Sequence, residues 1–457
     1  MAKRRISWLL AASTAGLFTT LAQAASTPPP PPPPNPPPAG AEFPDATGQS
    51  ATISATGPAL ATHPFFTSLG SNGRTCYNCH HPEEGWSITP ASVQARFQET
   101  NGLAPIFRTV DGANSPNANV STVAARQAAY SMLLTRGDIR IGLPVPSGAE
   151  FTLTAANDPY GFASPAQLSL FRRPLPPTNL AFTSTVMWDG RETISSTNIA
   201  ADLAHQAATA VLTHEQASAA PSAAVLNQLV TFERGLYTAQ SLDNAAGPLG
   251  AFGANGGPRY LTTLPFTLGE NDPTSASFNP NVFTIFGRWQ GITAPDAQSR
   301  ARASIARGEA IFNTRPIAVT GVAGFNDVVH LSLARTTCSG CHNTPEVGNH
   351  SSAAFMDLGL TDAARRTSDM PLYTLRNSST GAVRLTTDPG RALVTGKWAD
   401  IGKFKIPTLR GLPARAPYFH NGSAASTRDV VDFYNGRFNM NLNPNERADL
   451  KAFLDSL

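Results

Sequence analysis

Two copies of one five-residue pattern constrain this chain more than anything else in its sequence. Residues 76–80 read CYNCH and residues 338–342 read CSGCH, so both fit C-x-x-C-H, and together they use all four cysteines of the 457-residue chain. The pattern attaches c-type haem, because two thiols add to the porphyrin vinyl groups and the next residue sets an imidazole under the iron. We therefore expect two covalently bound haem c groups. The attachment residues are Cys76, Cys79 and His80 in the first copy and Cys338, Cys341 and His342 in the second, with His80 and His342 as iron ligands.

Other uses of cysteine pairs explain the pattern less well. Four cysteines can form two disulfides in an oxidising compartment, and a C-x-x-C pair can be a redox switch or half of a zinc site. None of these alternatives accounts for the histidine that follows both pairs.

The N-terminus has the layout of a secretory signal peptide. Basic residues 3–5 precede an apolar stretch over residues 6–21 and the small-residue pattern Ala22-Gln23-Ala24. We expect residues 1–24 to be removed, the protein to be periplasmic and no membrane span to remain. A retained N-terminal anchor is the alternative, although the stretch is short and contains Ser and Thr. Residues 25–42 follow as a proline-rich tether, because proline fixes φ and offers no N–H.

The charge balance argues against one large class of partners. Of the 34 basic residues, three lie in the signal segment, so 31 remain against 31 acidic ones. A protein that binds the phosphate backbone of nucleic acid needs a clustered basic excess, so we expect no nucleic-acid partner. Only 14% of the residues are charged, while 39 Pro and 36 Gly indicate long irregular connections.

Local patterns predict helices around both motifs. We expect helices over 302–312 and from Pro444 onward, where Asn443 can cap the helix and Glu446 can complete a capping box. The last helix carries an apolar stripe at helical spacing: Leu450, Phe453, Leu454 and Leu457. Residues 221–236 carry an apolar stripe at helical spacing, and residues 199–217 also read as helical. The predicted fold is mainly α, with two cytochrome c-like haem domains and long irregular connections. The N-terminal domain is expected over 43–242, a connecting segment over 243–299 and the C-terminal domain over 300–457.

Further segments accompany the two motifs in a fixed order. They are 172–174 (RRP) and 187–192 (MWDGRE) between the motifs, then 404–410 (FKIPTLR) and 416–422 (APYFHNG) after the second. With this series the chain resembles the bacterial diheme cytochrome c peroxidase and MauG superfamily from about residue 60 to its end. The resemblance implies an N-terminal haem that meets peroxide, a C-terminal haem that handles electrons and a tryptophan between them. Trp188 matches that tryptophan as an electron relay, and plain packing between the domains is the alternative.

The resemblance also bears on which iron stays open. Several members have a histidine shortly after the first motif that caps the N-terminal haem. Here His81 is too close to its neighbour His80, and the next histidine is His205. We therefore expect an N-terminal haem that is already open in its ferric form, where peroxide can bind.

For the C-terminal haem, an ungapped count from Ala416 puts Tyr434 at the position of the tyrosine ligand of MauG. A phenolate is a hard anionic donor that lowers the potential of the iron, so both irons could then share the oxidising equivalents of peroxide. The alternatives are Met440 or Met356 as a methionine ligand, and a tyrosine that is simply packed.

Breaking the O–O bond of peroxide needs a group that moves a proton between the two oxygens. In the superfamily a glutamine and a glutamate line this pocket. Gln206 matches the glutamine, while Glu215 matches the glutamate inexactly. On a helix His214 projects within about 80° of Gln206 and Glu215 points away, so we prefer His214 to Glu215. The alternative is that all three are polar residues on a solvated face.

One departure from the superfamily concerns calcium, which relatives hold between the domains. Arg173 and Arg415 stand at the asparagine and threonine positions of that site, and a guanidinium can take over the charge of the ion, which makes calcium doubtful here. His420 is expected to contact a haem propionate rather than bind iron. Three further cations are candidate propionate partners, with solvated surface as an equal alternative: Arg391, Lys403 and Lys405.

These residues lead us to expect a cytochrome c peroxidase-type oxidoreductase that reduces hydrogen peroxide to water, with electrons from a small cytochrome c or cupredoxin. The alternatives are a MauG-like oxidase that modifies a partner protein and a pure electron-transfer diheme cytochrome. Residues 103–169 show no motif of chemical interest.

Overall fold

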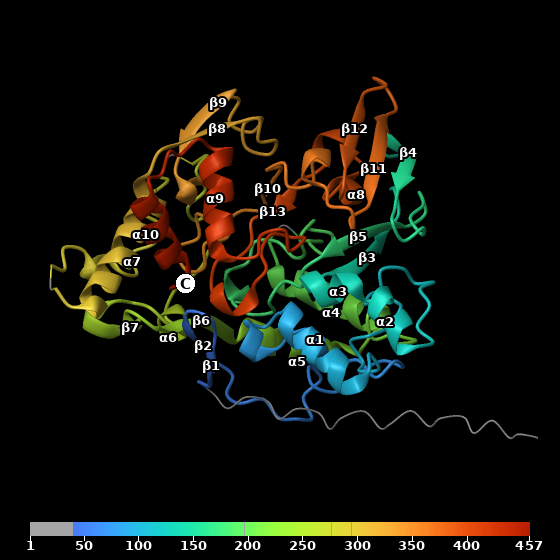
Figure 1. Cartoon of the computed structure of the whole chain (residues 1–457), viewed down its shortest axis with the longest axis horizontal. Coiled ribbons are helices and arrows are strands. Elements are labelled where there is room, and N and C mark those ends of the chain that lie inside the picture. The colour runs from blue at the N-terminus through green and yellow to red at the C-terminus, as the bar shows by residue number, and fades with distance from the viewer. Residues whose placement is uncertain (1–39, 196, 276, 294) are drawn as a thin grey trace, which may run out of the picture. The chain divides into compact units, whose positions relative to one another are not determined.

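A computed structural model describes residues 40–457 apart from 196, 276 and 294 (Figure 1). The predicted signal peptide, residues 1–24, and the tether up to residue 39 lie outside the described residues. Among the described residues, the first regular element is β1 (Glu42–Pro44). In the described part, no helix combines the length and the apolar character needed to cross a bilayer.

The helices of the C-terminal part form where the sequence predicts them. α10 (Pro444–Leu454) starts after Asn443, whose side chain accepts from two N–H groups of the first turn, and Glu446 completes the capping box. α7 (Ala297–Thr314) includes the predicted segment and packs against α10. α9 (Thr427–Arg437) lies beside α10. The predicted apolar stripe is buried: Leu450, Phe453, Leu454 and Leu457.

In the N-terminal part the two predicted helices are confirmed but end earlier than expected. α4 (Ile199–Thr213) stops before residue 217, and α5 (Ala223–Arg234) stops because Leu236 starts strand β6 (Leu236–Asp243). α4 and α5 pack against each other. The other α-helices of the described residues are α1 (Pro90–Thr100), which is as long as α10, and four shorter ones: α2 (Val123–Ala129), α3 (Ser131–Arg136), α6 (Pro258–Leu261) and α8 (Ala392–Thr395).

The prediction of a mainly α fold is wrong. Over the described residues, helix makes up 30% and strand 16%, and the strands form five small antiparallel sheets. One sheet has the order β1, β2 (Gly48–Ser54), β6, β7 (Gly247–Pro248), and another has the order β12 (Val383–Thr386), β11 (Leu372–Asn377), β4 (Phe151–Asn157). The others are pairs: β3 (Ile139–Leu143) with β5 (Leu168–Arg172), β8 (Ile317–Thr320) with β9 (Leu333–Thr336), and β10 (Phe355–Met356) with β13 (Phe404–Lys405).

The strands were missed because most of them are short, and their sequences mix Thr with apolar residues in alternation rather than in helical stripes. β4 (FTLTAAN) and β12 (VRLT) are examples. Such segments gain their stability from cross-strand neighbours, which come from distant parts of the chain. β4 pairs with β11, more than 200 residues later, and both lie together in Figure 1.

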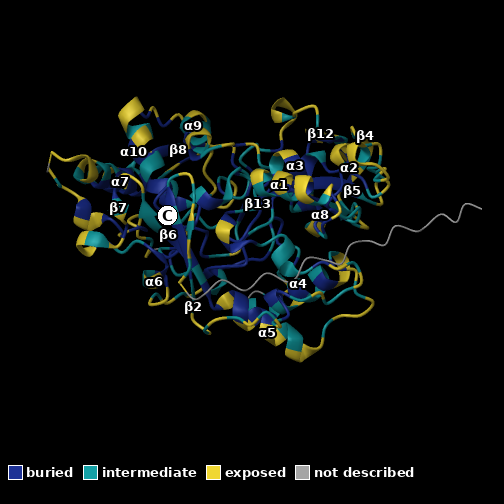
Figure 2. Ribbon diagram, turned by 60° about the horizontal axis from the view of Figure 1, so that its bottom comes forward, coloured by how far each residue is buried: buried dark blue, intermediate teal, exposed yellow. Residues whose placement is uncertain are grey.

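The segment expected to connect the domains contributes to the core. Phe283, Phe286 and Trp289 are fully buried. The Phe283 ring packs with Phe312 of α7 and Phe453 of α10, the Phe286 ring also packs with Phe453, and Trp289 packs against Phe286. In Figure 2, β6 is coloured mostly as buried, while α5 turns an exposed face outward. Residues 243–299 therefore pack as part of the folded body. Whether the chain divides at the predicted domain boundaries stays a prediction.

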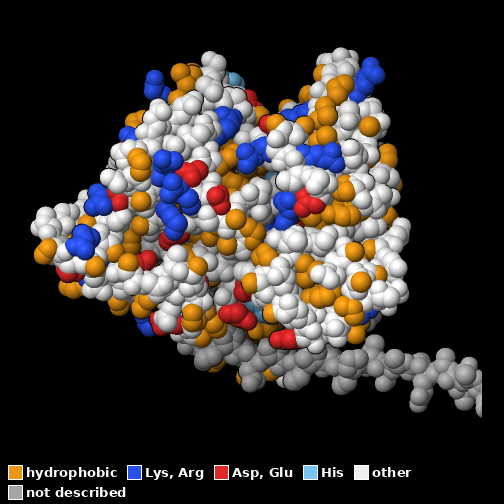
Figure 3. Space-filling view, in the orientation of Figure 1, with side chains coloured by type: hydrophobic (Ala, Val, Ile, Leu, Met, Phe, Trp, Pro, Cys, Tyr) orange, Lys and Arg blue, Asp and Glu red, His pale blue; other side chains and the backbone are white. Residues whose placement is uncertain are grey.

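The outer faces of these helices carry paired charges. Arg428 and Arg447 both contact Asp432, and Arg315 contacts Glu446 at 2.8 Å. Figure 3 shows basic and acidic side chains interspersed over the face that carries α9 and α10. Exposed pairs of this kind contribute little to stability, so the buried apolar contacts hold these helices together.

A truncation in this core tests that conclusion. Phe453→Ala is expected to lower the free energy of unfolding by about 3–5 kcal/mol, because the ring is fully buried among three other phenylalanines. Chemical denaturation of the purified protein measures the loss. Asn445→Ala, on the exposed side of the same helix, is the control and should change stability by less than about 1 kcal/mol. Equal effects of the two changes would contradict the assignment of this core.

Candidate haem sites

Both C-x-x-C-H motifs adopt the same local backbone. Each opens with a 3₁₀ turn, over Cys76–Asn78 and Cys338–Gly340. In each, the N–H of the second cysteine donates to the carbonyl of the first at 3.2 Å. The two cysteines and the histidine of one motif line one cavity, and those of the other motif line a second cavity.

The two histidines are also held in the same way. The Nδ1 atom of His80 lies 3.0 Å from the carbonyl oxygen of Trp86, and that of His342 lies 2.5 Å from the carbonyl oxygen of Gly348. Each carbonyl belongs to the residue six positions after its histidine. With Nδ1–H as the donor, Nε2 keeps its lone pair for a metal. Burial lowers the pKa of both histidines to about 4, so both rings are neutral near pH 7.

The four thiols are free, which bears on the alternatives for the cysteines. Burial raises the pKa of Cys79 to about 11 and the pKa of Cys338 and Cys341 to about 12. A redox switch needs a thiol whose pKa is lowered, so the geometry does not favour that alternative. The two pairs line different cavities, which leaves no zinc site shared between them.

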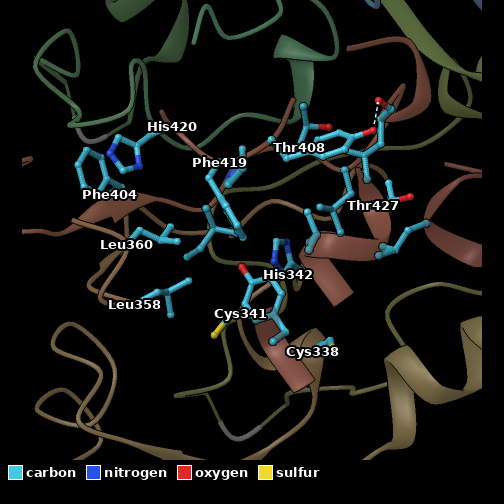
Figure 4. Close-up of a pocket in the computed structure, with 18 of the residues that line it drawn as sticks. Cys338, Cys341, His342, Leu358, Leu360, Phe404, Thr408, Phe419, His420 and Thr427 are labelled. Carbon is cyan, nitrogen blue, oxygen red and sulfur yellow. Dashed lines mark hydrogen bonds between the residues drawn. The ribbon is translucent and has the colours of Figure 1, made fainter. Parts of the chain in front are cut away.

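Both cavities have room for a porphyrin. The space between the lining side chains, part of it open to solvent, amounts to about 1530 Å³ at the first motif and about 1570 Å³ at the second. Figure 4 shows the second cavity, with Cys338 and Cys341 at one end, the His342 ring pointing inward and His420 on the opposite side. Free thiols, a histidine with its Nε2 available and this volume together fit covalently attached haem.

Trp188 lies in the wall between the two cavities and lines both of them. Its indole N–H donates to the carbonyl of Arg173 at 2.8 Å, and its own carbonyl accepts from the N–H of Lys405 at 2.8 Å. Arg173 and Lys405 also line both cavities. The tryptophan is therefore fixed by backbone bonds to segments from both halves of the chain.

A buried ionic network holds the segment that carries Trp188. Arg172 contacts Asp189 at 2.6 Å and binds Asp388 through two nitrogens at 2.7 and 2.9 Å. Burial alone would raise the pKa of Asp189, but Arg172 and Arg191 outweigh it and lower the pKa to about 2. The Asp189 carboxylate therefore stays ionised, and through Arg172 the network ties the residue after Trp188 to Asp388 in the C-terminal half.

The three candidates for the acid and base all line the first cavity: Gln206, His214 and Glu215. Glu215 accepts a 2.7 Å hydrogen bond from the N–H of Leu69, and its other oxygen lies 3.9 Å from the Cys76 sulfur. Its carboxylate thus lies at the edge of the cavity that carries Cys76, and it anchors the loop around Leu69. The helical projection used to compare the candidates does not extend to Glu215, because α4 ends at Thr213.

Sequence reasoning missed two further residues of this cavity, Arg74 and Asp111. Asp111 lies within residues 103–169, where no motif of interest was seen, yet it contacts the ring of His214 and the guanidinium of Arg74. A lone aspartate in an irregular segment carries no pattern in the sequence. Asp111 and His214 are 103 positions apart in the sequence, and only the fold brings them into contact.

In the second cavity, Tyr434 of α9 lies with both alternative methionines. The Met356 sulfur is 3.5 Å from the Cys341 sulfur, which places Met356 beside the attachment edge. Burial, with the nearby Cys341 and Cys338, raises the pKa of Tyr434. Among the described residues, the structure holds no hydrogen bond to the Tyr434 hydroxyl. Such a phenol is free to bind a metal inside the cavity.

The expected propionate partners separate into two groups. His420 is 1% exposed and lines the second cavity, and neither of its ring nitrogens has a hydrogen-bond partner in the part of the chain that is described. Its ring stacks on Phe404 at 4.1 Å between centroids. Lys405 lines both cavities, and burial lowers its pKa to about 8. Arg391 and Lys403 instead line a separate cavity of about 770 Å³, so they do not reach either haem cavity.

Arg173 fills a cage of backbone carbonyls. Its guanidinium donates to the oxygens of Ile88 at 2.5 Å, Arg136 at 2.8 Å and Arg415 at 3.2 Å, and it lies 3.5 Å from that of Ala416. Gly137, with φ of 64°, makes room, because a Cβ there would fall 1.9 Å from the guanidinium. Burial lowers the pKa of Arg173 to about 10, which leaves it charged near pH 7.

Comparisons with known proteins agree with the motifs over part of the chain. No family profile matches it. Over 157 residues it is 32% identical to the cytochrome-c peroxidase IdrP1 of a Pseudomonas species (strain SCT), which covers 30% of this chain and 38% of that protein. Over 122 residues it is 34% identical to the cytochrome c551 peroxidase of Nitrosomonas europaea, which covers 26% and 30%.

The chain therefore matches less than two fifths of the length of these curated relatives. Their names support the resemblance to diheme peroxidases that the motifs carry. Among solved structures, a MauG-like protein associated with microbial copper homeostasis is similar with a TM-score of 0.34 and 16% identity, over 65% of this chain and 77% of that one.

Proposed function

We propose that this protein is a periplasmic diheme c-type peroxidase that reduces hydrogen peroxide to water. The observation that carries the proposal is the pair of large cavities, each lined by a C-x-x-C-H motif, with Trp188 in their common wall. The relatives named cytochrome c peroxidases support it. Bound haem supplies iron that exchanges electrons and can take peroxide where an axial position is open.

The first cavity is the peroxide site in this proposal. Its wall carries the polar side chains that proton transfer requires, while His81 turns away from it and contacts Arg96 and Glu83 instead. His214 takes a proton from one peroxide oxygen and returns it to the other. Gln206 holds the peroxide by hydrogen bonding, and Glu215 keeps the loop around Leu69 closed on the cavity.

The second cavity handles electrons. Tyr434 would be the second protein ligand of the iron held in this cavity, because Met356 sits beside the attachment thiol and the described residues make no hydrogen bond to the Tyr434 hydroxyl. The phenol loses its proton only on binding a cation, since burial raises its pKa. His420 and Lys405 would donate hydrogen bonds to the haem propionates, which would give a partner to the ring N–H of His420, which has none among the described residues. A small cytochrome c or cupredoxin donates electrons here, and Trp188 relays them.

A second function is favoured by one observation. Tyr434 is an anionic donor once bound to iron, which lowers the potential and suits storage of oxidising equivalents at the second site. This is the arrangement expected of a MauG-like oxidase that modifies a partner protein. An oxidised residue on a co-purified partner supports the oxidase, and steady peroxide turnover with a reduced donor protein supports the peroxidase.

The ferric spin state tests the proposal directly. Purified protein is expected to carry two covalent haems by pyridine haemochrome assay and to show a high-spin electron paramagnetic resonance signal from the open first site. It should also consume peroxide faster than free haem does when a reduced donor is present. A pure electron-transfer cytochrome would show two low-spin irons, and that result would reject the peroxidase.

Replacement of the relay tests the electron path. Trp188→Phe is expected to keep both haems and to lower peroxide turnover with a reduced donor at least tenfold, equivalent to about 1.4 kcal/mol, because the indole between the cavities is gone. Trp398→Phe is the matched control, since Trp398 packs in a different cluster and should keep full turnover. Unchanged turnover in Trp188→Phe would mean that electrons take another path.

The carbonyl cage around Arg173 supports a calcium-independent centre, because a guanidinium occupies the oxygen ligands that an ion would need. Treatment with a calcium chelator is therefore expected to leave the haem spectra and turnover unchanged. Arg173→Ala removes the cation and should lower turnover and disturb the haem spectra even with calcium added. Loss of activity in the chelated wild-type protein would count against this assignment.

A further inference from the structure

His214 combines contact with the first cavity and access to solvent. It is the residue directly after α4, its side chain is 34% exposed and it lines the first haem cavity. Its backbone is held on both sides: its N–H donates to Ala210 at 2.7 Å and its carbonyl accepts from the amide of Asn72 at 2.8 Å. A histidine in this position can exchange protons between the solvent and the cavity.

The ring of His214 is held by a buried carboxylate. Its Nδ1 atom contacts Oδ2 of Asp111, which is 4% exposed. The other oxygen of Asp111 contacts the guanidinium of Arg74. One carboxylate therefore bridges an arginine and the histidine, and it lies in the wall of the same cavity.

Arg74 is itself immobilised. Its Nε donates to the carbonyl of Pro105 at 2.9 Å, and a terminal nitrogen donates to that of Ile106 at 2.7 Å. Another contact reaches the carbonyl of His214 at 3.3 Å. The arginine is 2% exposed, so the pair with Asp111 is shielded from water, where charge-assisted bonds are strong.

The protonation of the pair follows from these contacts. Burial by itself would raise the pKa of Asp111, but Arg74 and His214 outweigh it, and the pKa is lowered. Asp111 is thus a carboxylate and only accepts hydrogen bonds. The His214 Nδ1 must be the donor, so Nε2 carries the lone pair whenever the ring is neutral.

We propose that Asp111 is the positioning residue for His214, fixing its tautomer so that Nε2 serves the first haem cavity as proton acceptor and donor. This inference rests on the proposed peroxidase function. Reduction of one peroxide to two waters takes two electrons, which the redox partner supplies, and two protons, for which the partly exposed His214 is the route from solvent. The proton that Nε2 takes from one peroxide oxygen returns to the other, so the ring ends the reaction unchanged.

The chain contains a natural comparison for this pair. His205, on the same helix, contacts Glu192 through its Nδ1 at 2.7 Å and is 46% exposed. Neither His205 nor Glu192 lines the haem cavity. Two histidine–carboxylate pairs thus lie close in sequence, and only the Asp111 pair belongs to the cavity. Glu192→Gln is therefore a matched control for Asp111→Asn.

The test uses the intact protein and two readouts. The first is steady-state peroxide reduction, and the second is the rate at which cyanide binds the ferric first haem. Hydrogen cyanide must lose its proton to bind iron, so this rate reports the base without turnover. Asp111→Asn is expected to lower kcat and the cyanide rate at least about tenfold, with the KM for the electron donor unchanged. Glu192→Gln should match the wild type in both.

A double-mutant cycle separates positioning from general structural support. In a His214→Ala background, Asp111→Asn is expected to cause no further loss in the cyanide rate, because the group it positions is absent. A further loss of about tenfold would overturn the inference, and so would wild-type rates in Asp111→Asn itself.

If Asp111→Asn fails to take up haem, Asp111→Glu is the deciding variant, because it keeps the negative charge. Its kcat and cyanide rate should stay within about threefold of wild type, and a larger loss would overturn the inference.

The two readouts also distinguish the failure of each proposal. A wild-type protein without peroxide turnover would reject the proposed function. The cyanide rates would still report whether Asp111 acts through His214.

Discussion

The arrangement of the two cavities depends on a pair of adjacent buried arginines. Arg172 binds carboxylates from both halves of the chain, and Arg173 gathers carbonyl groups from three separate segments. Between them they set the position of Trp188, whose indole bonds to the backbone of Arg173. Buried charges are costly unless every partner is in place, so this centre tolerates only one relative placement of the segments it joins. That placement puts one tryptophan in the wall of both cavities.

The two cavities differ in chemistry although their attachment motifs are alike. The first is lined by ionisable and amide side chains, among them Asp111, Gln206 and His214. The second is lined largely by aromatic and aliphatic residues, with Tyr434 as a candidate ligand and with His420, whose ring nitrogens have no hydrogen-bond partner in the described part of the chain. Proton transfer requires polar groups that can reach solvent, whereas electron transfer does not. The proposed division between a peroxide site and an electron site follows this difference.

Local signals in the sequence predicted local structure well. The cap at Asn443 and the apolar stripe of α10 were confirmed, because helix ends and helix faces depend on residues within a few positions of one another. The strands were overlooked, because β4 and β11 stabilise each other across more than 200 residues. Arg391 and Lys403 were grouped with Lys405 by charge alone, and the fold sends them to a different cavity.

The sequence by itself determined the proposed chemistry of attachment: two thiols and a histidine within five residues have a local spacing, so they can reach one porphyrin whatever the rest of the fold. Only the tertiary structure decided what surrounds each of the two motifs. Asp111 reaches His214, and Arg173 reaches its carbonyl cage, through contacts between segments with no shared pattern. Such contacts depend on burial and on the packing of distant elements, which no window of the sequence contains.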